Sequence, residues 1–178
     1  MIRPIILASC LVKKGNKYLL VQEATDKIIA GIDTHSKGKW TTPHGQADKG
    51  EEIQEAAERE LLEEAGGKTK IKRLGVVATG TLEGSIYIIS FVFYGEGFKR
   101  TGKRWRHEIK KTQWFTKKEI KVLEKKRLMR DNVPVAQFIK TIETGKKVEF
   151  IKWKHPEYVK EIFRIMDKTA VNITKEQK

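Results

Sequence analysis

The chain has 178 residues, of which 37 are Lys or Arg and 23 are Asp or Glu, and its formal net charge is +14. Its 39% of hydrophobic residues suffices for an ordinary globular core, so we expect about one domain rather than a disordered chain. A single cysteine excludes a disulfide framework, and no apolar run approaches the roughly 20 residues of a membrane-spanning helix. Without an export signal, the expected location is the cytoplasm.

The first part of the chain predicts a hairpin, a loop and a short strand. Residues 5–12 and 18–23 are apolar runs separated by a Lys- and Gly-containing turn. Residues 26–39 are expected to form a loop, and residues 39–42 a short strand that ends at Pro43.

A helix is predicted next, because apolar residues recur at helical spacing at Ile53, Ala56, Ala57 and Leu61. We expect Asp48 to cap the start of this helix, since Glu51 follows three residues later. Gly66 fits the C-terminal stop.

The remaining pattern predicts strands over residues 71–78 and 85–94, a polar loop over 95–111, a short strand over 112–115, and helices over 116–126, 131–144 and 156–168. Thr116 and Glu119 are expected to form a capping box, and Pro134 to lie in the first turn of a helix that Gly145 ends. The order favours a mixed α/β or α+β fold. We expect residues 1–150 to form one domain, with residues 151–178 as its C-terminal helical extension and tail.

The segment 45–67 reads GQADKGEEIQEAAERELLEEAGG and resembles the Nudix box. The box is Gly, five residues, Glu, seven residues, Arg-Glu, an aliphatic, any residue, Glu-Glu, any residue, Gly and an aliphatic. The chain supplies it with Gly45, Glu51, Arg59, Glu60, Leu61, Glu63, Glu64 and Gly66, and departs only at Gly67, where an aliphatic is usual. Seven fixed positions at roughly 5% each match by chance on the order of once in 10⁹ windows.

The acidic residues of this segment have a physical interpretation of their own. Glu63 and Glu64 follow Glu60 by three and four residues, so on a helix the three carboxylates can converge on one face. Hard oxygen ligands of this kind suit Mg²⁺, which also binds oxygen atoms of the substrate phosphates. Arg59 and Glu51 are two turns apart and can form an ion pair that braces the start of the helix. The alternative is an ordinary acidic amphipathic helix with glutamates in solvent.

Two residues before the helix belong to the same candidate site. Gly45 is expected to allow a close approach of the backbone, with its carbonyl available to a metal ion; a simple turn glycine is the compatible alternative. His44 stands where a second glycine is frequent in the family. It is a candidate contact to a phosphate or base, or else a tolerated loop residue.

The positive charge lies in the second part of the chain. Residues 1–67 hold 9 basic and 11 acidic side chains, whereas residues 68–178 hold 28 and 12. Within the expected loop, Arg104, Trp105 and Arg106 are candidates for binding a polyphosphate and stacking on a base, and a solvated loop is the alternative. Nudix enzymes often place a further acidic residue before a strand that ends in Trp-Phe. Glu108, before Trp114 and Phe115, is that candidate, unless it only pairs with a nearby Lys or Arg.

The resemblance implies a mixed sheet between helices, with the box as a loop–helix–loop. It implies Mg²⁺-dependent hydrolysis, with Mn²⁺ as a substitute, of a pyrophosphate bond in a nucleoside di- or triphosphate or related small substrate by water attack on phosphorus. Glu60, Glu63, Glu64 and Gly45 would hold the metal, Arg59, Glu51 and Gly66 would support the box, and Glu108 or a box glutamate would accept the proton.

A broader similarity covers roughly residues 1–150. The stretches Ala8-Ser9-Cys10 and Tyr18-Leu19-Leu20-Val21, with Trp40, Pro43, Trp114-Phe115 and Gly145, are similar to phosphatases of thiamine-precursor pyrophosphates and nucleoside phosphates. Two alternative functions stay open: removal of pyrophosphate from RNA 5′ ends, and nucleotide or RNA binding by a Nudix fold without catalysis.

Overall fold

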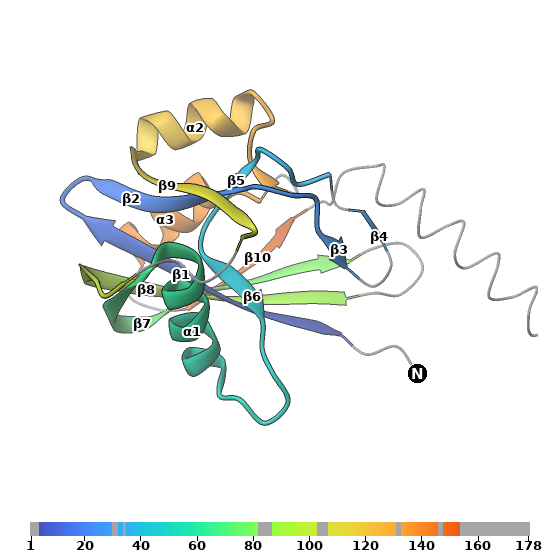
Figure 1. Ribbon diagram of the computed structural model, residues 1–178. Helices are drawn as coiled ribbons and strands as arrows, with labels where there is room; N and C mark the ends of the chain where they lie inside the picture. The colour runs from blue at the N-terminus through green and yellow to red at the C-terminus, as the bar shows by residue number, and fades with distance from the viewer. Residues whose placement is uncertain are drawn as a thin grey trace, which may run out of the picture.

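The computed structural model describes residues 4–29, 32–33, 35–81, 87–102, 107–130, 133–145 and 148–153 (Figure 1). Its strands are β1 (Ile5–Lys14), β2 (Lys17–Glu23), β3 (Ile28–Ile29), β4 (Ile32–Asp33), β5 (Trp40–Thr41), β6 (His44–Gln46), β7 (Gly67–Thr81), β8 (Tyr87–Arg100), β9 (Ile109–Thr116) and β10 (Glu149–Trp153). Its helices are α1 (Ile53–Ala65), α2 (Lys117–Lys125) and α3 (Val135–Thr144). None of the helices in these ranges combines the length and the apolar character needed to cross a membrane.

The main sheet is mixed, as the sequence predicts. Its strands follow the order β10-β7-β8-β1-β2-β5, while β6 pairs with β1 and β9 pairs with β2. β1 runs parallel to β8 and β10 runs parallel to β7, whereas the other pairs are antiparallel. Strands β3 and β4 form a separate two-stranded sheet inside the expected loop 26–39.

Helices cover both faces of the main sheet (Figure 1). Side chains alternate along β1, so Leu11 points into a core shared with α2 and α3, whereas Cys10 and Val12 point into a second core shared with α1. The same alternation separates Leu20 of β2 from Leu19. The expected sandwich of a mixed sheet between helices is therefore confirmed.

The local signals around the helices have a mixed outcome. Gly66 ends α1 as predicted, in the left-handed conformation with φ 68°. The prediction for Asp48 is wrong, because the N-cap of α1 is Glu52 and no side chain caps it. Asp48 instead forms a turn with Glu51, whose backbone N–H donates to the Asp48 carbonyl at 3.1 Å. The Asp48 N–H in turn donates to the Glu51 carboxylate at 2.9 Å.

The later helices follow their predicted caps. Thr116 and Glu119 form the expected capping box at the start of α2, in which each side chain bonds the other's backbone N–H. α3 begins later than predicted, with Pro134 at its N-cap rather than inside its first turn. Gly145 is its C-cap, as expected.

The expected polar loop 95–111 is partly wrong. β8 continues to Arg100 because its backbone pairs with β7 through Gly67, and β9 already begins at Ile109. The charged composition of this stretch reflects exposed strand ends and not the absence of a strand.

The sequence also did not reveal β10, which pairs in parallel with β7. Residue 150, the expected end of the domain, lies within β10. The helix expected over 156–168 and the tail over 169–178 lie outside the described residues.

Candidate active site

Helix α1 buries two of the glutamates that the sequence singles out. Ala56, Ala57 and Leu61 are fully buried in the core that α1 shares with the sheet, which fixes how the helix is rotated. This rotation leaves Glu60 and Glu64 each only 1% exposed, while Glu63 is partly exposed. Carboxylates are almost never buried to this degree unless they are paired or bind an ion.

Gly45 of β6 lies directly against the Glu60 carboxylate. A Cβ at position 45 would be 2.1 Å from Glu60 Oε1 and 2.6 Å from Oε2, closer than atoms can approach. The absence of a side chain at Gly45 is therefore what allows β6 and α1 to bring this carboxylate against the backbone. The expected close approach is present, and the role of the Gly45 carbonyl toward a metal stays a prediction.

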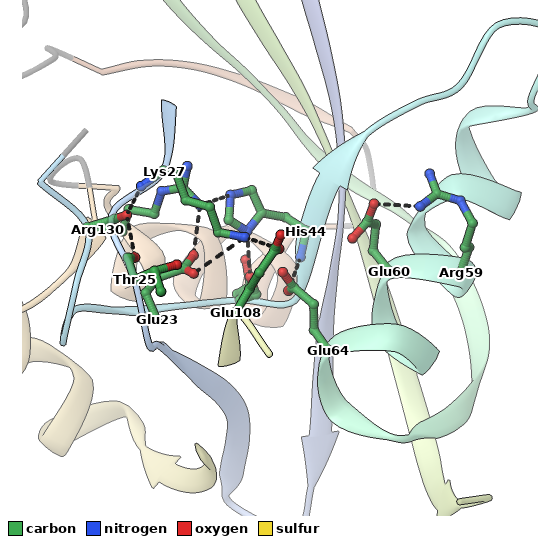
Figure 2. A network of polar contacts seen from close by, with 11 residues as sticks. Glu23, Thr25, Lys27, His44, Arg59, Glu60, Glu64, Glu108 and Arg130 are labelled. Carbon is green, nitrogen blue, oxygen red and sulfur yellow. Dashed lines mark hydrogen bonds and ion pairs between the residues drawn. The ribbon is translucent and has the colours of Figure 1, made fainter. Parts of the chain in front are cut away.

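Arg59 joins the start of the box to its glutamates. Its Nε and Nη2 donate to the two Glu51 carboxylate oxygens at 2.8 and 2.9 Å, a bidentate pair. Its Nη1 donates to Glu60 Oε1 at 2.6 Å (Figure 2). The same Nη1 lies 3.6 Å from Glu63 Oε1. The hydrogen bonds from Arg59 hold the pKa of Glu51 at about 2. The structure thus contains the expected Arg59–Glu51 pair at the loop-to-helix junction.

Glu64 lies among other carboxylates. The backbone N–H of His44 donates to its Oε2 at 3.0 Å. Burial raises the pKa of Glu64 to about 8, and the negative charges of Glu23 and Glu60 add to this effect. The Lys27 ammonium acts in the opposite direction. A carboxylate in this position gains strongly from any cation that lies between it and its neighbours.

A second polar group, which sequence analysis missed, faces Glu64 (Figure 2). Glu23, at the end of β2, is fully buried, and Arg130 donates to its Oε1 at 2.8 Å. Lys27 Nζ lies 3.8 Å from Glu23 Oε2 and also contacts the Glu108 carboxylate. Burial raises the pKa of Glu23 even though Arg130 and Lys27 lower it.

One signal for Glu23 was present in the sequence. Leu19, Val21 and Glu23 alternate along β2, so they share the face that packs on α1. An acidic residue at an inward-facing strand position indicates a buried polar site rather than a part of the hydrophobic core. Lys27 and Arg130 carry no such signal, since both lie at the edges of irregular segments.

The structure brings Glu108 to this second group, where its carboxylate pairs with Lys27. It precedes β9, its carbonyl accepts from the Ala24 N–H at 2.6 Å, and its side chain is 44% exposed. Its pairing with Lys27 matches the alternative of a loop glutamate with a basic partner. The position beside Glu23 equally keeps it a candidate proton acceptor.

The other predicted positions divide into two sets. His44 lies between α1 and Arg130, and Gly66 ends the box helix. Arg104, Trp105 and Arg106 lie outside the described residues.

Gly67, the one departure from the box, has a structural cause: a Cβ there would be 2.4 Å from the Phe98 ring. Phe98 thus occupies the space that an aliphatic side chain would take.

The donor chemistry fits a hard divalent cation. Glu60, Glu63, Glu64 and Glu23 supply carboxylate oxygens, and Glu23 Oε2 is buried without a hydrogen bond in the described part of the chain. Within that same part, no three His, Cys, Asp or Glu side chains are already arranged as a metal-binding group. The cationic groups of Arg59 and Lys27 contact the carboxylates instead, so a metal ion would have to replace some of these contacts.

The NUDIX domain profile matches residues 3–138. A NUDIX hydrolase from Nitrosomonas europaea is 26% identical over 82% of this chain and 93% of that one, with a TM-score of 0.65. A MutT protein from Bacillus halodurans is 21% identical over 86% and 92% of the two chains, with a TM-score of 0.63. An ADP-ribose pyrophosphatase from Streptococcus suis is 14% identical over 83% and 99%, with a TM-score of 0.56, and shares the fold. No curated protein matches the sequence.

Proposed function

The chain belongs to the NUDIX domain family, and from this premise we propose that it is a Mg²⁺-dependent hydrolase of pyrophosphate bonds. The substrate class is a nucleoside di- or triphosphate or a related small pyrophosphate. The family supports the hydrolase class, and the pyrophosphatase among the similar structures supports the kind of bond.

The observation that carries the proposal is the burial of Glu60 and Glu64 on one face of α1, with Glu23 nearby. An ordinary acidic helix would direct these side chains into solvent, where the charged carboxylates keep their hydration. Here burial and mutual repulsion raise the pKa of Glu64 to about 8. A divalent cation relieves this repulsion, and carboxylate oxygens are its preferred ligands.

Each residue of the box has a role in this proposal. Glu60, Glu63 and Glu64 would hold Mg²⁺, with the Gly45 carbonyl as a further oxygen donor. When bound, the ion supplies charge neutralisation at the phosphates and activates water. Arg59 orients Glu60 while Glu51 holds Arg59 in place through its bidentate pair.

Water attacks phosphorus and must lose a proton during the reaction. Glu108, partly exposed and beside Glu23, is our candidate acceptor, and a box glutamate is the alternative. In the structure the Lys27 ammonium donates a hydrogen bond to the Glu108 carboxylate. Whichever carboxylate accepts the proton, the leaving phosphate carries away the electron pair of the broken P–O bond.

A substrate panel tests the proposal. The wild-type protein would be incubated with Mg²⁺ or EDTA and nucleoside di- and triphosphates, sugar nucleotides, dinucleoside polyphosphates, thiamine-type pyrophosphates and 5′-triphosphate RNA. We expect Mg²⁺-dependent cleavage of at least one small pyrophosphate, faster than that of RNA. Faster cleavage of RNA would instead support the 5′-end activity.

A matched pair of variants separates the box from general effects. Glu63→Gln removes a proposed ligand, whereas Glu55→Gln changes an exposed glutamate on the same helix. We expect the first to lose at least 10²-fold in kcat and the second to keep wild-type activity. Equal activity of Glu63→Gln and wild type would refute the catalytic assignment.

A further inference from the structure

Arg130 connects the second polar group to the box from far away in the sequence. Arg130 is only 5% exposed, and its Nη1 donates to Glu23 Oε1 at 2.8 Å. The same Nη1 lies 3.2 Å from His44 Nε2 (Figure 2). One guanidinium nitrogen therefore bridges a strand-end carboxylate and the imidazole that begins β6.

These contacts fix the tautomer of His44. Its Nδ1 lies 3.0 Å from the Thr42 carbonyl oxygen, which can only accept a hydrogen bond. Its Nε2 faces Arg130, whose guanidinium can only donate. The two contacts match the ring form that has its proton on Nδ1 and its lone pair on Nε2. Both ring nitrogens are used within the protein in this arrangement.

The backbone of the same residue holds a box glutamate. The His44 N–H donates to Glu64 Oε2 at 3.0 Å, and β6 pairs with β1 through His44 and Ser9. A ring fixed at both nitrogens restricts the rotation of His44 about its side-chain bonds. The His44 N–H that contacts Glu64 is held by the pairing of β6 with β1, and the ring contacts anchor the same residue through its side chain.

We propose that Arg130 is a positioning residue of the active site: with Glu23 it fixes the His44 ring, and through His44 it holds Glu64 in place. This inference rests on the proposed function, in which Glu64 is a metal ligand. A buried ion pair gains little stability over a well-packed apolar pair, so stability alone does not explain the Glu23–Arg130 pair. The orientation of His44 does explain it.

The state of His44 is measured directly by ¹⁵N NMR of the imidazoles at pH 7.5, without metal or substrate. The sequence has four histidines, so the His44→Asn variant assigns the signals of His44. We expect a neutral ring protonated at Nδ1 in the wild type. In the double variant Glu23→Gln/Arg130→Met, which removes both charges together, we expect loss of this single tautomer.

Two further variants complete the design. Arg130→Lys keeps a positive charge for Glu23 but not the planar guanidinium, so it tests the idea if the double variant fails to fold. Arg127→Met is the matched control, because Arg127 lies three residues away and is exposed. We expect Arg130→Lys to lose the single tautomer and Arg127→Met to keep it.

If Glu64 is no longer held in place, the protein should bind a metal ion more weakly. The affinity is measured with Mn²⁺ alone, and the free Mn²⁺ is followed by electron paramagnetic resonance. Loss of an outer partner of a ligand typically weakens metal binding about 10-fold to 100-fold. We expect at least a tenfold weaker affinity in Arg130→Lys, which keeps the Glu23 carboxylate, and an unchanged affinity in Arg127→Met.

The two measurements separate the inference from the function on which it rests. If wild type binds Mn²⁺ but the variants keep the His44 tautomer, or Arg130→Lys keeps the wild-type affinity, the inference is overturned. If wild type binds no Mn²⁺, the proposed metal function fails, whatever His44 shows. A changed tautomer together with weaker Mn²⁺ binding in Arg130→Lys supports the inference.

Discussion

Gly45→Ala perturbs the contact that brings β6 against the box helix. The added Cβ would lie 2.1 Å from Glu60 Oε1 and 2.3 Å from its carboxyl carbon. The carboxylate would have to move by roughly 1 Å to reach an ordinary van der Waals distance. Glu60 is only 1% exposed and is bonded to Arg59, so it has little room to do so.

The size of the effect follows from this displacement. A misplacement of about 1 Å in an active site can cost about 10²-fold in rate. Overpacking costs about 1–3 kcal/mol in general, and it should lie at the low end here because the clash involves the end of a side chain. The lower entropy of the unfolded alanine variant offsets about 0.4–1 kcal/mol of this. We therefore expect a large loss of activity with a small loss of stability.

The assay compares kcat and the free energy of unfolding of Gly45→Ala with those of wild type and Gly102→Ala. Gly102 is the matched control, because a Cβ there would meet nothing within 4 Å among the described residues. We expect about a 10²-fold lower kcat for Gly45→Ala and wild-type values for the control. If Gly45→Ala stays within threefold of wild type, the displacement argument is wrong.

Four further predictions follow from individual contacts. Because the pKa of Glu64 is about 8 when folded and 4.5 when unfolded, the metal-free protein should lose stability as pH rises from 4.5 to 8, by at most about 1.4 kcal/mol per pH unit. Urea unfolding in EDTA should show a shallower decrease for Glu64→Gln; equal slopes would exclude this cause. Glu51→Gln should remove a charge-assisted bond to Arg59, lowering the unfolding free energy by about 1 kcal/mol and kcat about tenfold. Thr116→Ala should lose about 1 kcal/mol through the α2 cap without a change in kcat, and a lower kcat would contradict a purely structural role. Glu108→Gln should lower kcat about 10²-fold or more while Mn²⁺ affinity is kept, and weaker Mn²⁺ binding would make Glu108 a ligand instead.

Signals that act within a few residues of the chain were predictable. The spacing of Ala56 and Leu61 gave the buried face of α1, and Gly66 gave its end, because helix faces and caps are local properties. The capping box of Thr116 is local in the same sense. The Arg59–Glu51 pair was predictable because both residues belong to one motif of fixed spacing.

The second polar group depends on contacts between distant parts of the chain. Glu23 and Arg130 are 107 residues apart, and only the packing of β2 against the segment before α3 brings them together. Alternation placed Glu23 on an inward face but did not identify its partner. The expected loop over 95–111 failed for a related reason, since pairing with β7 extends β8 through residues whose composition favours a loop.

The central claim is that the carboxylates of the box carry metal-dependent hydrolysis of a pyrophosphate bond. It is tested most directly by ³¹P NMR of the products formed from the best substrate in H₂¹⁸O, with wild type and Glu64→Gln side by side. We expect wild type with Mg²⁺ to place ¹⁸O in one phosphate product, and EDTA or Glu64→Gln to abolish this incorporation. Undiminished incorporation by Glu64→Gln, or in EDTA, would contradict it.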